Sequence, residues 1–131
     1  MPKSGCTSLP SGVFYPGGIN LLGPGVALHM VGFLEEREQL IAHGVPEPDL
    51  RISERAQVVF PYHRLFDEYE EERLDKRSFG STRAGIAPFY ADKALKIGVQ
   101  VANLSVGKRL RARLGAPLAT ENVLLERLEP A

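Results

Sequence analysis

Short apolar runs and a helix-spaced apolar pattern follow one another along the first part of the chain. Apolar runs at residues 19–22 and 26–29 stand on either side of Gly23-Pro24-Gly25 and predict two short strands. From Phe33 to Ile41 the apolar residues recur at helical spacing, and Gly44 is a suitable C-cap for a helix of about three turns. The pattern therefore predicts two strands followed by a helix.

The middle of the chain repeats the order of strand and then helix. Residues 50–52 and 56–60 predict two strand pieces, the second almost continuously apolar, as in a strand buried within a sheet. Pro61 suits the first turn of the next helix, in which one face carries Tyr62, Leu65, Phe66, Tyr69 and Arg73. The acidic run DEYEEER predicts the solvated side of this helix. We assign no catalytic role to its carboxylates Asp67, Glu68, Glu70, Glu71 and Glu72.

Beyond residue 98 the pattern is mainly helical. Val99-Gln100-Val101 predicts a short strand, and two helices are expected at about 105–114 and 120–128. The alternation of strands and helices indicates the α/β class. We predict one partial domain over 1–131, with a loop-and-helix segment at 79–98 and a helical tail at 115–131.

Composition limits the classes of function. The 131 residues carry 16 cationic and 16 acidic side chains, so the charge does not indicate nucleic-acid binding. Cys6 is the single cysteine, which leaves no disulfide framework, and no cluster of His, Cys or carboxylates has metal-ligand spacing. No apolar run approaches the ~18 residues of a transmembrane helix. We expect a soluble, cytoplasmic protein without a membrane or nucleic-acid partner.

One segment, FGSTRAGIAPFYADKALKIG from Phe79 to Gly98, points to a particular chemistry. Its first half is a glycine-bounded loop with two hydroxyls and a cation, and a predicted helix with two lysines follows. Glycine lets backbone N–H groups approach an anion closely, while hydroxyls, a helix N-terminus and lysines add donors and charge. This combination suits a phosphate group, although an ordinary solvated turn before a surface helix has a similar composition.

The same segment carries a family resemblance. GSTRAGIAPFYADK resembles the G-T-T-G-R-G-I-G-P-x-Y-x-D-K signature of the adenylosuccinate synthetase family, whose members join IMP to aspartate using GTP. Three further stretches are similar to that family in the same order: Leu9–Leu28, Phe33–Val45 and Leu50–Glu68, which contains P-Y-H. The resemblance covers roughly residues 8 to 115.

The resemblance implies a piece of a larger P-loop-like α/β fold with a central sheet and flanking helices. It also implies a homodimeric ligase of purine nucleotide biosynthesis that uses GTP and Mg²⁺. In such a protein this segment would hold the IMP phosphate and form part of the dimer contact. The candidate phosphate-binding residues are Ser81, Thr82, Lys93 and Lys96, and Lys96 stands where a family arginine reaches the IMP of the partner subunit.

Two of the candidate residues depart from the family pattern. Arg83 stands one place earlier than the family arginine, and this shift re-aims its guanidinium, so Arg83 is an additional candidate only. Lys96 keeps the charge of the arginine that it replaces but loses the bidentate geometry.

The family's opening G-D-E-G-K-G loop and its N-A-G-H-T histidine have no counterpart in the sequence. We therefore expect an internal piece of a longer protein, assign no catalytic residue, and expect these residues alone to bind no GTP or Mg²⁺ and to lack ligase activity. A non-catalytic phosphate-binding or assembly module, and a truncated remnant without a ligand, are alternatives. We also expect self-association, because Val58–Phe60 would present an unpaired apolar edge.

Overall fold

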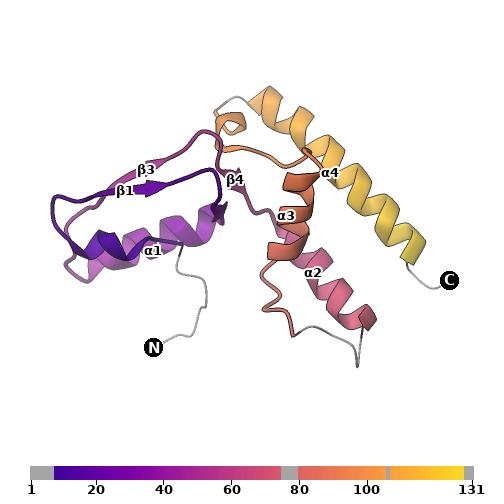
Figure 1. The fold of residues 1–131 in the computed structure, drawn as a ribbon, viewed down its shortest axis with the longest axis horizontal. Coiled ribbons are helices and arrows are strands. Elements are labelled where there is room, and N and C mark those ends of the chain that lie inside the picture. Colours follow the sequence, from indigo (N-terminus) through magenta and orange to yellow (C-terminus); the bar gives the residue numbers. More distant parts are fainter. Residues whose placement is uncertain (1–7, 75–79, 106, 129–131) are drawn as a thin grey trace.

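Two parallel strand pairs and four α-helices make up the structure, a computed structural model that describes residues 8–74, 80–105 and 107–128. Figure 1 shows the strand pair β1–β3 beside α1 at one end of the molecule and helices α2, α3 and α4 at the other. The short strands β2 and β4 lie between these two groups of elements.

The first strand pair forms as the apolar pattern predicts. β1 (Ile19–Leu22) runs parallel to β3 (Asp49–Ile52), in a register that sets Ile19 beside Asp49 and Leu22 beside Ile52. The crossover between them contains α1 (Met30–Ala42), as parallel pairing requires. Gly44, the glycine predicted to cap the C-terminus of α1, has a φ of 86°, which confirms that prediction.

Burial alternates along β1, and this alternation places the core. Leu22 is buried on one face of the strand and packs in a cluster with Leu28 and Phe33. On the opposite face, Ile19 and Leu21 remain 57% and 70% exposed. The short 3-10 turn η1 (Ser11–Phe14) adds Val13 to the cluster.

The second strand pair corrects one prediction. β2 (Ala27–Leu28) runs parallel to β4 (Gln57–Val58), and both strands are shorter than predicted. The Val58 N–H donates to the Val99 carbonyl at 2.9 Å, and Gln100 forms an antiparallel bridge with Gln57. Since β4 is paired on both sides, the expected unpaired edge at Val58–Phe60 is wrong. The Val99–Val101 stretch supplies that bridge and then turns into the 3-10 helix η3 (Val101–Asn103).

Helices α2 (Pro61–Leu74) and α3 (Ile86–Ala94) pack against each other, and Pro61 begins α2 as predicted. The prediction of two C-terminal helices is wrong, because α4 runs unbroken over Gly107–Leu128 with Pro117 inside it. A proline removes one backbone hydrogen bond, and the neighbouring turns maintain the helix. Residues 129–131 of the predicted tail lie outside the described residues.

These elements form a mixed α/β piece with small parallel sheets, so the predicted class is confirmed. Within the described residues the strands form two separate two-stranded sheets rather than one central sheet. No helix in this part of the chain is long and apolar enough to cross a membrane.

The exposed apolar face of β1 generates a prediction about self-association. Parallel sheets are normally covered on both faces, whereas Ile19 and Leu21 are exposed. We expect the chain to self-associate through this face, and Leu21→Thr to shift it toward the monomer while keeping a strand-forming residue. Light scattering over a concentration series measures the change. Leu65→Gln, which removes a leucine of similar exposure from α2, should have no effect; a monomeric wild type would contradict the prediction.

Candidate functional site

The predicted phosphate segment forms a sharp loop that leads into a helix. Its first residue, Phe79, lies outside the described residues, and residues 80–85 form the loop that precedes α3. Backbone φ is positive at Gly80, Arg83 and Gly85, with values of 69°, 55° and 79°. Glycine adopts this region freely, whereas Arg83 holds it at a cost of about 1–3 kcal/mol.

Gly85 brings the loop against the first turn of α2. A Cβ atom at this position would lie 2.8 Å from both the Arg64 nitrogen and the His63 carbonyl carbon, closer than side chains can approach. Glycine is therefore needed at 85 for its conformation and for its lack of a side chain. Gly85 is also the N-cap of α3, and it supplies no side-chain cap.

Two carboxylates of α2 hold the loop, and they overturn the prediction of a solvated face. Asp67 and Glu71 are 6% and 8% exposed, one helical turn apart on the buried side of α2, and His63 extends the same row. The Asp67 carboxylate accepts the Ser81 hydroxyl at 2.9 and 3.0 Å and the Gly85 N–H at 2.9 Å. Glu71 accepts the Ser81 N–H at 3.2 Å. Conversely, Leu65, predicted on the apolar face, is 64% exposed.

The loop N–H groups divide into two sets. Those of Ser81 and Gly85 donate to the carboxylates, and that of Arg83 donates to the Ser81 hydroxyl oxygen at 3.1 Å. Within the described part of the chain, no hydrogen bond engages the N–H groups of Thr82 and Ala84 or the exposed Thr82 hydroxyl. At the N-terminus of α3, the amides of Ile86 and Ala87 are open in the same way, as the first turn of any helix leaves them.

Ser81 differs from Thr82 in what it can offer a ligand. Its hydroxyl proton goes to Asp67 and its N–H goes to Glu71. A direct bond from Ser81 to a phosphate therefore requires exchange of one of these partners, and the predicted contact stays a prediction.

Lys93 and Tyr90 connect α3 to the loop between β1 and β2. The Lys93 ammonium donates to the Pro24 carbonyl at 2.6 Å, and the Tyr90 hydroxyl donates to the Gly25 carbonyl at 2.8 Å. The ammonium also lies 5.8 Å from the centre of the Tyr90 ring. An ammonium has three donors, so Lys93 retains two for a ligand.

The other two candidate cations are exposed and have strained backbones. Arg83 and Lys96 are the non-glycine residues with positive φ in the described chain, at 55° and 62°. Lys96 follows the end of α3, where the N–H groups of Ile97 and Gly98 both donate to the Asp92 carbonyl. Such strain occurs preferentially at functional sites, but by itself it assigns no ligand.

A second polar network joins α2 to α3. The Phe60 N–H donates to His63 Nδ1 at 2.9 Å, which places the ring proton on Nε2, and this nitrogen donates to Asp92 at 3.2 Å. The Tyr62 hydroxyl donates to the same Asp92 oxygen at 3.0 Å. Burial lowers the pKa of His63, and the Asp92 carboxylate partly offsets this effect. His63 thus has the structural hydrogen bond predicted for it.

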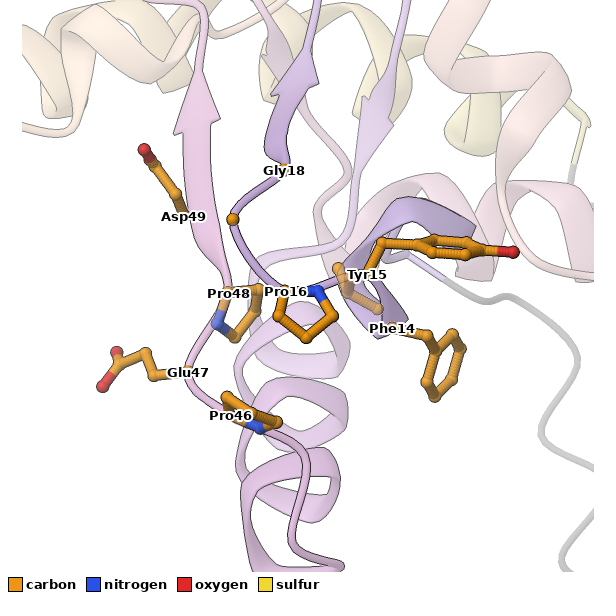
Figure 2. A pocket seen from close by; sticks show the side chains of 10 residues that line it. Phe14, Tyr15, Pro16, Gly18, Pro46, Glu47, Pro48 and Asp49 are labelled. Carbon is orange, nitrogen blue, oxygen red and sulfur yellow. The ribbon is translucent and has the colours of Figure 1, made fainter.

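A pocket lies at the amino ends of β1 and β3, and none of the candidate residues lines it. Figure 2 shows Phe14 and Tyr15 on one side of this pocket and Glu47 and Asp49 on the other. Both carboxylates are already in ion pairs, Glu47 with Arg37 and Asp49 with Arg51. Among the described residues, no group of three or more His, Cys, Asp or Glu is arranged to hold a metal ion.

Comparisons with known proteins agree with the resemblance. A family model described as adenylosuccinate synthetase matches residues 3–131. The adenylosuccinate synthetase of Heliobacterium modesticaldum is 41% identical over 120 residues, covering 92% of this chain and 28% of that protein. The protein of the same name from Staphylococcus saprophyticus is 47% identical over 96 residues, covering 73% of this chain and 22% of that protein.

A solved structure is also similar. The fully ligated adenylosuccinate synthetase of Plasmodium falciparum matches with a TM-score of 0.77 and 27% identity, covering 93% of this chain and 29% of that chain. This chain therefore spans less than a third of the length of the proteins that it resembles.

The close approach at Gly85 predicts a specific sensitivity to substitution. Gly85→Ala should lower the free energy of unfolding by about 2–4 kcal/mol, because it adds left-handed strain and a clash with the start of α2. Urea titration followed by circular dichroism measures the change. Gly115→Ala is the matched control: it lies in α4, where a Cβ meets nothing within 4 Å, and alanine should raise stability by up to about 1 kcal/mol. Equal effects of the two substitutions would contradict this account.

The buried histidine predicts the sign of a pH dependence. Because folding lowers the pKa of His63, the unfolded chain binds more protons between the folded value and the ordinary value near 6.5. The contribution of His63 to stability is therefore complete above about pH 6.5 and is lost as the pH falls through the folded pKa. Urea unfolding at several pH values should show a decline toward acid that is smaller in His63→Gln. The exposed His43 provides the control, since His43→Gln should retain the full decline.

Proposed function

Because the chain belongs to the adenylosuccinate synthetase family, we propose that it forms the part of such an enzyme that holds the phosphate of IMP. The enzyme would join IMP and aspartate in cytoplasmic purine nucleotide biosynthesis. The anchoring site would be the loop at residues 80–85 with the first turn of α3.

The open donors of this loop are the observation that carries the proposal. The amides of Thr82 and Ala84 alternate with amides that are tied to protein acceptors, and the Thr82 hydroxyl and the first amides of α3 lie next to them in the chain. Open N–H groups in a loop that leads into a helix N-terminus suit a phosphate. An ordinary solvated turn does not require buried carboxylates to fix its alternate amides.

Cations have to supply the attraction between this loop and an anion. The buried carboxylates Asp67 and Glu71 repel a phosphate bound to the loop, so the open amides alone are a weak site. Lys93 lies on α3 with two ammonium donors to spare, and it would contact the phosphate directly. Lys96 would act on the IMP of the partner subunit in a homodimer, and Arg83 is an additional candidate in the loop itself.

Anchoring a phosphate would contribute to the reaction at a distance. Binding energy from a part of the substrate that does not react can orient the part that does. In the proposed role this chain holds the phosphate of IMP so that the base meets reacting groups elsewhere in a full-length enzyme. The strand pairs β1–β3 and β2–β4 would then belong to the central sheet of the larger P-loop-like fold.

GTP and Mg²⁺ have no family motif of their own in this sequence: the G-D-E-G-K-G loop has no counterpart, and Gly107-Lys108 lacks the spaced glycine and the following Ser or Thr of a Walker A loop. We therefore assign both cofactors to other parts of a full-length enzyme, and no catalytic step to this chain.

Calorimetric titration with IMP tests the proposal residue by residue. Thr82→Ala and Lys93→Ala should each weaken binding by roughly ten- to hundred-fold, the cost of losing a hydrogen bond to a charged group. Arg83→Ala should cost less, because Arg83 is out of register with the family signature. Lys108→Ala, which removes an exposed cation from α4, is the control and should change nothing. Absence of IMP binding by the wild type would end the proposal, and a larger loss in Arg83→Ala would overturn the residue assignment.

A further inference from the structure

We infer that Asp67 is a positioning residue, which holds loop 80–85 in the conformation that leaves the Thr82 and Ala84 amides open to a phosphate. This inference rests on the proposed function, since it names the group that prepares the same site. Asp67 itself lies behind the loop and would not touch the ligand. Glu71, one turn further along α2, assists it through the Ser81 N–H.

The hydrogen bonds of Asp67 reach both ends of the loop. One carboxylate accepts the hydroxyl of Ser81 near the start of the loop and the N–H of Gly85 at its end. Ser81 in turn fixes the middle of the loop, because its hydroxyl oxygen accepts the Arg83 N–H at 3.1 Å. Together with the bond from the Ser81 N–H to Glu71, these contacts fix the amides at 81, 83 and 85, and the amides between them are left for another acceptor.

Asp67 also bonds the N-cap residue of α3, a helix that has no side-chain cap. Gly85, at the N-cap position, has no side chain with which to accept an N–H group of the first turn. The first-turn N–H groups therefore stay open, and the buried Asp67 carboxylate accepts the N–H of Gly85 itself, which sets a negative charge from α2 near the positive end of the α3 dipole. The loop and the start of α3 are consequently fixed by one group.

The charge of Asp67 and its positioning role have opposite effects on phosphate binding. As a nearby anion it repels a phosphate, so neutralising it would strengthen binding if charge were its main contribution. As the acceptor that fixes the loop, Asp67 favours phosphate binding. Removing one of its acceptor oxygens would therefore weaken the binding of phosphate. The sign of the change in affinity therefore separates a positioning residue from a bystander carboxylate.

Asp67→Asn is the test variant, because it preserves shape and removes the charge and one acceptor oxygen. We expect IMP affinity to fall by about ten-fold, the cost of one buried hydrogen bond that is no longer made. Amide hydrogen exchange at Gly85, followed by NMR on the free chain, should accelerate in the same variant. Ser81→Ala removes the other end of the contact and should reproduce both changes if Asp67→Asn fails to fold.

Glu72→Gln provides the matched control, since it neutralises an exposed carboxylate of the same helix and should alter neither measurement. Stronger IMP binding by Asp67→Asn, or unchanged exchange at Gly85, would overturn the inference. If the wild type binds no IMP while Gly85 exchange still accelerates in Asp67→Asn, the proposed function fails and the role of Asp67 in fixing the loop stands. These outcomes separate failure of the inference from failure of the function.

Discussion

A buried carboxylate must find hydrogen-bond donors, and Asp67 finds them in the loop that precedes α3. An unpaired carboxylate in such a place would cost several kcal/mol, so the loop conformation and the packing of α2 depend on one another. Ser81 and Gly85 satisfy the charge only when the loop folds back onto α2. The left-handed turns at Arg83 and Gly85 and the absence of a Cβ at 85 follow from this requirement.

A second buried carboxylate stabilises the other end of the same helix pair. Asp92 accepts from His63 and Tyr62, while Asp67 accepts from Gly85, so each helix gives one acceptor to donors on or beside the other. Phe89 packs edge-on against His63 between these two contacts, with ring centres 5.8 Å apart. Hydrogen bonds at two points, together with this aromatic contact, restrict the relative orientation of α2 and α3 more than apolar packing alone would.

The sequence predicted those elements whose signals are local. Apolar runs located β1 and β3, Pro61 located the start of α2, and Gly44 located the end of α1, because each signal acts within a few residues. The burial of Asp67 and Glu71 depends on donors that lie beyond the end of α2, and a charge run by itself resembles a solvated face. Their spacing of four residues, continued back to His63, was the available signal. The two helices expected at about 105–114 and 120–128 are one helix, α4, which continues through Pro117.

Tyr90 and Lys93 join α3 to the loop between β1 and β2, and the chemistry of their contacts determines whether the sequences of relatives would reveal them. Tyr90 and Lys93 reach across 65 and 69 residues, but both of their acceptors are main-chain carbonyls. Every residue type offers that carbonyl, so the contact imposes no side-chain identity on positions 24 and 25. Covariation between relatives would therefore not reveal this contact, although it joins two distant parts of the chain, and only the retention of Tyr90 and Lys93 would indicate it.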